Sequence, residues 1–487
     1  MKKVIFSLLA VSSMLIGCRD EDKLLDSSAQ NYVSQDQLSE LIAKFPEKAS
    51  SITSGFESGN NKYMVAFGGA HERFGYMSIL LGMEFMTNDA AINSTKYPHF
   101  ATTYYPYRSR DVDHHTNEWV WTFYYKVVYN MNLILNSLPS TSTITEDKQM
   151  RGRALAMRAL AYLDLVRLYG ADGLGIPYYS QSVNSNARVP SSTVMGYIET
   201  DLKEAYNLLT GYRRSDKQSI NKNVVSGFLA RYYMEAKNYT LAAQYANEAR
   251  QGYTPMSAAQ LMDGFDDISN PEWMWGADID GSTSTIYASF FSHMSNMNRG
   301  YAGLGVQKMI DKRLYNKISS TDYRKQWFLG SDTNVTQIGV TVPVKLPQYS
   351  NLKFQDASGS SFVGDYVYMR AAEMYFIEAE AYARLGNNTQ AQDVLYDIMS
   401  KRDPSYVKST STGNTLLEEI MVNKRIELWG EGQNFFDQKR WGVSLDRTYS
   451  GTNHSPSGQL NIAAGDSKFN FMIPQAELDA NKSVSNP

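Results

Sequence analysis

Apolar residues along much of the chain recur with the period of an α-helix, and the helical segments come in neighbouring pairs. The clearest pair covers residues 365–401, with a turn at Gly386, Asn387 and Asn388. Its first helix carries on one face Val367, Ala371, Met374, Ala381, Tyr382 and Leu385. The second places at i, i+3, i+4 and i+7 the residues Ala391, Val394, Leu395 and Ile398.

A second pair has the same form. Residues 224–237 form a helix, Asn238 makes the turn, and the next helix carries Ala242, Tyr245, Ala246 and Ala249. Small alanines let two helices approach closely, as tetratricopeptide repeats require. Further helices are predicted over residues 118–138, 149–169, 194–209 and 416–429. The pattern predicts a mostly α fold, a tetratricopeptide-type helical repeat scaffold of about four pairs, each burying its neighbour's apolar face.

Two long stretches lack this periodicity. Residues 63–116 are rich in Gly, Asn, Tyr and His, and residues 256–361 combine polar loops with short strand-like runs such as 273–276. Insertions on a repeat scaffold are where binding sites usually lie, so we expect these two to form a ligand face.

No Pro- or Ser-rich linker separates independent units. We therefore expect one domain over residues 28–487, with an N-terminal part at 28–220 and a C-terminal part at 221–487.

The first residues indicate export. Two lysines precede an apolar run that is too short to span a bilayer, which is typical of a cleaved signal peptide, here residues 1–17. The run ends in Leu-Ile-Gly-Cys18, which resembles the bacterial lipobox, and Cys18 is the only cysteine in the chain. We expect Cys18 to be lipidated. Residues 18–27 then form a charged leash, whose acidic cluster resembles the surface-export signal of Bacteroidetes lipoproteins.

The composition limits the classes of molecule that the protein is expected to bind. The formal net charge is −3 and no polybasic run is present, so we expect no nucleic-acid partner. No segment after the signal is long and apolar enough to cross a membrane, so contact with the membrane is expected through the lipid anchor. The 34 tyrosines offer flat apolar faces with a hydroxyl, which suit sugars or polar chains.

Four segments, in this order behind the lipobox, resemble the SusD/RagB family over residues 18–487. They are RGRALAMRALAYLDLVRLYG (151–170), VYMRAAEMYFIEAEAYARLG (367–386), NKRIELWGEGQNFFDQKRWG (423–442) and MIPQAELDAN (472–481). Asn423 departs from the acidic residue usual in the family, and Gln433-Asn434 stands where His-Arg is common.

The resemblance implies an outer-membrane lipoprotein that faces the cell exterior. Such a protein binds a nutrient, usually an oligosaccharide and sometimes a peptide, and delivers it to a SusC-like TonB-dependent transporter. Taken by themselves, the alternating charges of the third segment predict ion pairs that tie the terminal helices to the body. These charges are Arg425, Glu427, Glu431, Asp437 and Arg440.

Common catalytic motifs are missing from the sequence. It contains no GxxxxGK loop, GxSxG elbow or HExxH helix, so we expect no enzyme, no cofactor and no metal. His114-His115, beside Asp111 and Asp113, fit a polar loop before a helix better than a metal site. Asp266-Asp267 fit a turn better than the separated carboxylates of a glycoside hydrolase.

The two insertions supply the candidate ligand residues. Residues 97–108 (YPHFATTYYPYR) contain four tyrosines, of which we expect at least one ring to be exposed, and the candidates here are Tyr104, Tyr105, Tyr107 and Arg108. Residues 293–301 (HMSNMNRGY) add His293, Asn296, Arg299 and Tyr301, and Asp89 in the early insertion joins them. A solvated loop is an equally good interpretation of residues 293–301. A surface hydrolase or an adhesin remains a less favoured alternative to nutrient capture.

Overall fold

The computed structural model describes residues 35–65, 70–336 and 343–486. The expected signal peptide, Cys18 and the leash lie outside the described residues. The chain divides into two compact units, residues 1–52 and 53–487. The first unit includes α3 (Gln35–Lys44), η1 (Pro46–Lys48) and the beginning of α4 (Ala49–Val65). No described helix has the length and apolar character needed to cross a membrane.

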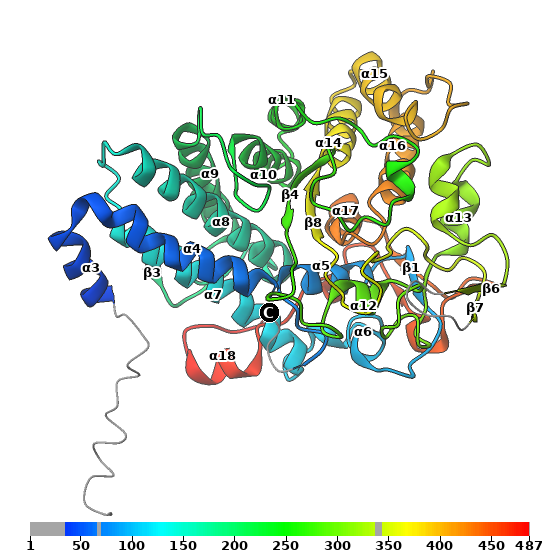
Figure 1. Cartoon of the computed structure of the whole chain (residues 1–487), viewed down its shortest axis with the longest axis horizontal. Coiled ribbons are helices and arrows are strands. Elements are labelled where there is room, and N and C mark those ends of the chain that lie inside the picture. The colour runs from blue at the N-terminus through cyan, green and yellow to red at the C-terminus, as the bar shows by residue number, and fades with distance from the viewer. Residues whose placement is uncertain (1–34, 66–69, 337–342, 487) are drawn as a thin grey trace, which may run out of the picture. The chain divides into compact units, whose positions relative to one another are not determined.

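Paired helices form the scaffold of the second unit, and Figure 1 shows α7 to α10 lying side by side. From α7 to α11 and from α14 to α16, each helix packs against its neighbours in sequence, α14 also contacts α11 and α16, and α17 contacts α5 (Tyr76–Glu84). The helices are α7 (His115–Ser137), α8 (Thr145–Tyr169), α9 (Ser191–Leu208), α10 (Lys222–Glu235), α11 (Tyr239–Ala249), α14 (Ala371–Arg384), α15 (Asn388–Met399), α16 (Gly413–Glu427) and α17 (Gln433–Trp441). The predicted mostly α, repeat-type scaffold is confirmed.

The pair α10–α11 illustrates why these sequences form helical repeats. The Asn238 side chain caps α11 by accepting a hydrogen bond from the Leu241 amide at 3.2 Å. The alanines of the predicted stripe are buried, which permits the close approach of α11 to α10 and α14. In the next pair, Gly386 has a φ of +78° and ends α14, because this left-handed conformation suits glycine.

The structure moves the beginning of the helix expected at residue 365, and it contains helices that were not predicted, such as α4, α5 and α17. Residues 366–370 form strand β8 (Tyr366–Arg370), which pairs antiparallel with β4 (Trp273–Ala277), so the helix begins at Ala371 instead of residue 365. The first insertion contains α5 (Tyr76–Glu84), all nine residues of which are buried. A helix buried on every side has no polar face, and periodicity therefore does not reveal it.

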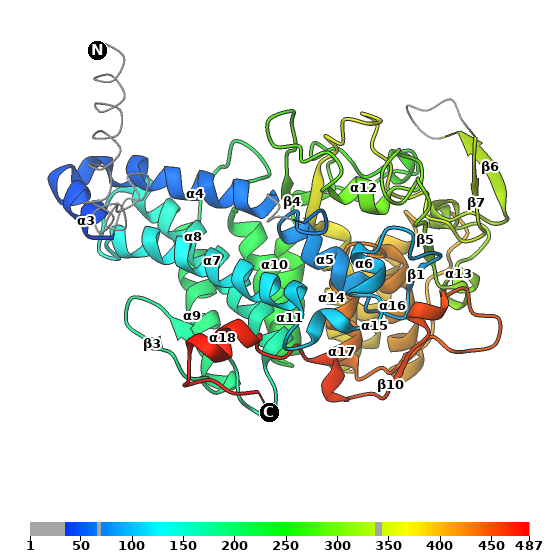
Figure 2. The ribbon, with the colours of Figure 1, turned by 90° about the horizontal axis from the view of Figure 1, so that it is seen from below.

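Short elements make up the two insertions and the C-terminal region (Figure 2). The first insertion contains β1 (Ala90–Ile92), α6 (His99–Thr102) and η2 (Arg108–Arg110). The second contains η3 (Gln260–Met262), α12 (Phe290–Met294), β5 (Lys308–Ile310), α13 (Lys312–Lys317), η4 (Tyr323–Trp327), β6 (Thr333–Thr336) and β7 (Pro343–Leu346). Elsewhere lie β2 (Tyr178–Tyr179), β3 (Asn184–Ser185), β9 (Leu445–Asp446), η5 (Pro456–Gly458), β10 (Asn461–Ile462), η6 (Ser467–Phe469) and α18 (Gln475–Ala480).

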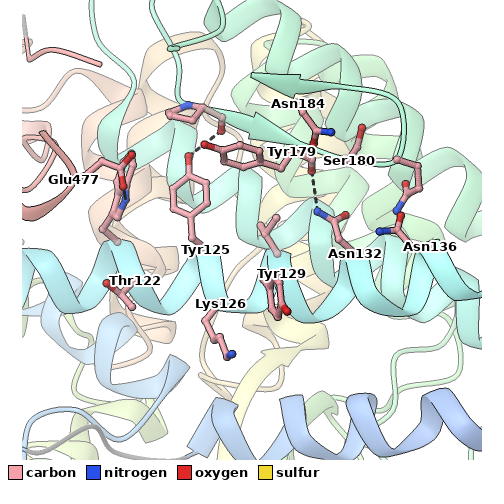
Figure 3. A pocket seen from close by; sticks show the side chains of 14 residues that line it. Thr122, Tyr125, Lys126, Tyr129, Asn132, Asn136, Tyr179, Ser180, Asn184 and Glu477 are labelled. Carbon is pink, nitrogen blue, oxygen red and sulfur yellow. Dashed lines mark hydrogen bonds between the residues drawn. The ribbon is translucent and has the colours of Figure 1, made fainter. Parts of the chain in front are cut away.

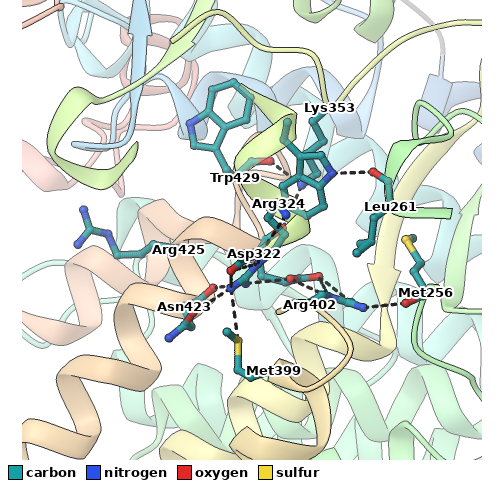
Figure 4. Close-up of polar contacts among 12 residues, drawn as sticks. Met256, Leu261, Asp322, Arg324, Lys353, Met399, Arg402, Asn423, Arg425 and Trp429 are labelled. Atoms are coloured by element: carbon teal, nitrogen blue, oxygen red, sulfur yellow. Dashed lines mark hydrogen bonds and ion pairs between the residues drawn. The ribbon is translucent and has the colours of Figure 1, made fainter. Parts of the chain in front are cut away.

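A network of buried ion pairs joins the second insertion to the helical scaffold (Figure 4). Glu427, at the end of α16, accepts hydrogen bonds from Arg370 at 2.6 Å, Arg402 at 2.8 Å and Arg324 at 3.1 Å. The complete network consists of Arg324, Lys353, Arg370, Arg402, Glu272, Asp322, Glu427 and Glu431. Its four positive and four negative charges balance, and each side chain is almost completely buried. The predicted ion pairing of the third sequence segment is confirmed.

Replacing Glu427 by Gln should lower the free energy of unfolding by about 3–5 kcal/mol, because it leaves buried arginines without a counter-charge. Urea denaturation measures this difference. Asp393→Asn is the matched control, since it breaks the half-exposed pair with Lys408 and should cost less than about 1 kcal/mol. Equal effects of the two substitutions would contradict the role assigned to the network.

Glu84, at the end of α5, is also a buried carboxyl group, but it lies outside the ion-pair network, and its pKa is raised. Burial and the negative charge of Asp89 raise its pKa from 4.5 to about 8, although the Gly432 amide donates a hydrogen bond to it at 3.2 Å. The folded protein therefore holds Glu84 protonated at neutral pH. Because the folded pKa is raised, this group stabilises the fold fully below pH 4.5 and loses that contribution as pH rises toward about 8.

Glu84→Gln should therefore gain stability relative to the wild type as pH rises through the window from 4.5 to about 8. Denaturation curves of both proteins across that window measure the difference. The exposed Glu146→Gln serves as the control and should follow the wild type. A pH-independent difference for Glu84→Gln would mean that the folded protein holds this carboxyl ionised.

Candidate functional site

The two insertions meet through a strand pair. β1 and β5 run antiparallel, with Ala90 opposite Ile310 and Ile92 opposite Lys308. Asp89, directly before β1, accepts a hydrogen bond from Arg425 Nε at 2.9 Å, and its backbone carbonyl accepts one from Trp429 Nε1 at 2.9 Å. These bonds fasten the first insertion to α16 and its C-terminal end.

Polar side chains beneath the surface hold the second insertion. The Asn296 amide donates to the carbonyl oxygens of Lys308 at 2.8 Å and Asn351 at 3.1 Å, and its oxygen accepts from the Lys308 amide at 2.9 Å. His293 on α12 lies with Nε2 2.9 Å from the carbonyl oxygen of His71. Burial lowers the pKa of His293 well below its usual range, so a neutral ring donates this bond from Nε2. It links the second insertion to the first.

Above these contacts lies a group of rings that we call the histidine–tyrosine cluster: His71, Tyr97, His99, Tyr287, His293 and Tyr301. Tyr301 is central. Its ring centroid is 4.5 Å from that of His99, 4.7 Å from His293, 5.2 Å from Tyr97 and 6.2 Å from Tyr287. The Tyr301 hydroxyl also forms a hydrogen bond with His71 Nδ1. Both insertions therefore contribute to one surface.

A buried carboxylate supports the cluster from the side of α7. Glu72 lies 2.9 Å from His99 Nδ1 and 3.6 Å from His115 Nε2. Burial alone would raise the pKa of Glu72, but hydrogen bonds with His99 and His115 and the charge of His99 lower it to about 2. Glu72 is therefore a fixed negative charge that orients His99. Because Glu72 stays ionised at neutral pH, it is unsuited to the role of a general acid.

The outward side of the cluster combines aromatic, apolar and basic groups. Tyr287 is 46% exposed and Ile286 is 51% exposed. Ile286 has a φ of +53°, a left-handed conformation that β-branched residues rarely adopt, and such strain is often kept where a loop binds something. Lys96 donates to the Leu304 carbonyl at 3.1 Å and holds the loop of Tyr97 against the second insertion. Arg299 is exposed two residues before Tyr301.

Six of the nine predicted ligand residues are buried, which removes the expected direct contact with a ligand in this conformation. Asp89, His293 and Asn296 hold the insertions as described above. Tyr104 stacks on Phe100, the Tyr105 hydroxyl lies 2.8 Å from His454 Nδ1, and Tyr107 donates to the carbonyl of Met86. Their exposed fractions are at most 6%. At least one tyrosine of residues 97–108 was expected to be exposed, and the partly exposed one is Tyr97.

The other three predicted residues remain accessible. Tyr301 is partly exposed in the cluster, Arg299 is exposed close to it, and Arg108 is exposed on η2. Tyr287 was missed by the sequence interpretation. The signal that could have indicated it is an Ile-Tyr pair directly after the polar run Gly-Ser-Thr-Ser-Thr at residues 281–285.

His114, Asp266 and Asp267, which the sequence offered as possible metal or catalytic residues, make structural hydrogen bonds. The His114 side chain accepts a hydrogen bond from the Thr116 amide and caps α7. Asp267 caps the turn before Asn270, and Asp266 accepts from the Ala357 amide at 2.7 Å. Burial raises the pKa of Asp266 to about 6. Over the described residues, no three His, Cys, Asp or Glu side chains gather in the manner of a metal site.

Together these features define a helical-repeat protein in which two loop insertions form one surface of aromatic, apolar and basic groups. Two family models match the chain: "Starch-binding associating with outer membrane" over residues 30–234 and "SusD family" over residues 282–486. The chain belongs to the SusD/RagB family, a class of nutrient-binding proteins associated with the outer membrane.

Individual relatives agree with this assignment. The SusD-like proteins P25 and P38 of Formosa agariphila are 21% and 22% identical, each across 67% of this chain and across 70% and 72% of their own lengths. The crystal structure of a SusD-like carbohydrate binding protein from Bacteroides vulgatus superposes with a TM-score of 0.78 at 24% identity, covering 89% of this chain and 97% of that one. A SusD superfamily protein from Bacteroides thetaiotaomicron gives 0.72 at 22% identity, covering 89% and 99%.

Tyr105→Ala should reduce the free energy of unfolding by about 3–5 kcal/mol, because it removes a completely buried ring that packs against His454 and Arg447. Tyr287→Ala is the matched control and should change it by less than about 0.5 kcal/mol, since that ring is 46% exposed. Urea denaturation compares the two. A stable Tyr105→Ala protein would mean that this ring is not part of the core.

Proposed function

We propose that this chain is a lipoprotein, anchored in the outer membrane through Cys18, that binds an oligosaccharide on its exterior face. It passes the ligand to a SusC-like TonB-dependent transporter. The observation that carries the proposal is the histidine–tyrosine cluster, in which both insertions present aromatic rings at one surface. The ligand-contacting residues are Tyr97, Tyr287, Arg299 and Tyr301.

The chemistry of the cluster suits a sugar. The faces of Tyr97 and Tyr287 offer flat apolar platforms for the C–H side of a pyranose ring. Arg299 and the Tyr301 hydroxyl provide hydrogen-bonding groups for sugar hydroxyls at the edge of those platforms. Underneath, the bonds of His293, Asn296 and Asp89 fix the loops, so that little conformational entropy remains to be lost on binding.

An open surface of this kind binds a single sugar segment weakly. At the cell exterior, a long glycan touches many copies of the protein, and a transporter directly below raises the effective concentration of captured ligand. Weak binding also allows release into the transporter. A peptide is the main alternative ligand, because Arg299 and the tyrosines also suit peptide carboxylates and backbone groups.

The double variant Tyr97→Ala/Tyr287→Ala should bind an oligosaccharide recognised by the wild type at least about tenfold more weakly, a loss of about 1.4 kcal/mol. Isothermal titration of the mature chain with glycan and peptide panels measures the affinities. Tyr396→Ala on α15 removes a ring that is 39% exposed outside the insertions, and it should bind as the wild type does.

The outcomes separate the candidate ligands. Heat with one class of glycan, reduced by the double variant alone, supports the proposal. Heat with peptides alone reassigns the ligand to the peptide class, and unchanged glycan affinity in the double variant removes the site from the cluster.

A further inference from the structure

A cavity lies along α7, and its lining residues lie outside the two insertions. Its volume is about 790 Å³, and its walls are α7, the β2–β3 hairpin and α18 (Figure 3). Cavities of a few hundred to about 1,000 Å³ are typical of ligand sites. None of its lining residues belongs to the histidine–tyrosine cluster. We call this cavity the α7 groove.

The walls of the α7 groove are held in place by hydrogen bonds. Tyr125 donates to the Pro177 carbonyl at 2.8 Å, and Asn132 donates to the Tyr179 carbonyl at 3.0 Å, which ties the hairpin to α7. Behind them, the buried Arg158 donates to Asn132 at 2.8 Å and to Gln181 at 2.9 Å, while it is paired with Asp201. The groove therefore exists before any ligand arrives.

Aromatic rings follow one another along the groove. Trp121, Tyr125 and Tyr129 stand four residues apart on α7, which spaces them by about 6 Å along the helix axis. The Trp121 and Tyr125 centroids are 4.7 Å apart, Tyr179 faces Tyr125 at 6.0 Å, and Tyr129 is 50% exposed. Trp121 is only 4% exposed, so the rings that a ligand can reach are those of Tyr125, Tyr129 and Tyr179. Rings arranged in this way suit an extended ligand with repeated apolar faces.

Polar groups accompany the rings, and their charges balance. Asn136 and Asn184 are exposed, and Figure 3 shows Asn136 at the end of the groove opposite Glu477 and Asn184 beside Tyr179. Lys126 and Glu477 are the lining residues that carry opposite charges, and the ammonium group of Lys126 lies 5.0 Å from the Tyr129 ring. Amides, hydroxyls and a net charge of zero favour a neutral ligand with many hydroxyl groups over an anionic one.

A peptide fits the groove less well. Extended peptides are usually bound by adding a strand to an open sheet edge, and the hairpin here consists of two strands of two residues each. We propose that the α7 groove is a second binding site for a neutral oligosaccharide. This goes beyond the proposed function, since it assigns a separate site that shares no residue with the cluster.

The test is isothermal titration of the mature chain, carrying Cys18→Ser so that no lipid is attached. The probes are the neutral hexasaccharides cellohexaose, xylohexaose, maltohexaose and mannohexaose. The groove variant is Tyr129→Ala/Asn136→Ala, the cluster variant is Tyr97→Ala/Tyr287→Ala, and Tyr396→Ala is the control. All of these positions are partly or fully exposed, so the melting temperature should stay that of the wild type.

We expect the cluster variant to retain one site per chain for at least one hexasaccharide. Combining it with the groove variant should weaken that remaining binding at least tenfold. Loss of all binding in the cluster variant, with a groove variant that matches the wild type, overturns the α7 groove and leaves the proposed function standing. If the groove variant reduces binding and the cluster variant leaves it unchanged, the α7 groove is supported and the cluster is overturned as the binding site of the proposed function. No heat from any of the four probes counts against the groove as a neutral-glycan site.

Discussion

In the second unit, four basic and four acidic side chains are removed from water together around Glu427 and Arg370. Placing any one of these charges in the interior alone would cost several kcal/mol, and only their mutual contact offsets that cost. The end of β8, the loop after α15, the end of α16 and η4 must therefore arrive in one common arrangement. Lys353 connects the network to α12 in the second insertion. Asn351 accepts a hydrogen bond from the Lys353 backbone amide and donates one to the Met294 carbonyl at the end of α12.

The same helix that supplies Glu427 also fixes the first insertion. Arg425, two residues earlier, bonds Asp89 at the beginning of β1, and Trp429 bonds the carbonyl of that same residue. One stretch of α16 and its C-terminal end thus sets the positions of both loops whose rings form the histidine–tyrosine cluster. The polar residues that look most like ligand contacts in the sequence, Asp89, His293 and Asn296, are the ones that do this positioning.

Periodicity was sufficient for helices that have one apolar and one polar face, as α11 and α15 do. It failed for α5, where every residue is buried, and for β8, whose five residues are buried on both faces and continue without a break into α14. At the site, the sequence located the two insertions that meet. It could not separate Tyr97 from Tyr105, because neighbouring tyrosines divide into surface and core only through contacts with distant segments, here His454 and Arg447.

In the two insertions, buried residues hold the loops in place and exposed residues form the surface, and this difference has an evolutionary consequence. Tyr287, Arg299 and Tyr97 make few of the contacts on which the fold depends, whereas the bonds beneath them are made by backbone atoms and by residues that never meet the solvent. Exposed positions can therefore mutate at little thermodynamic cost while the loops keep their course. If the proposed ligand face is correct, a few surface substitutions can change its specificity without changing the fold.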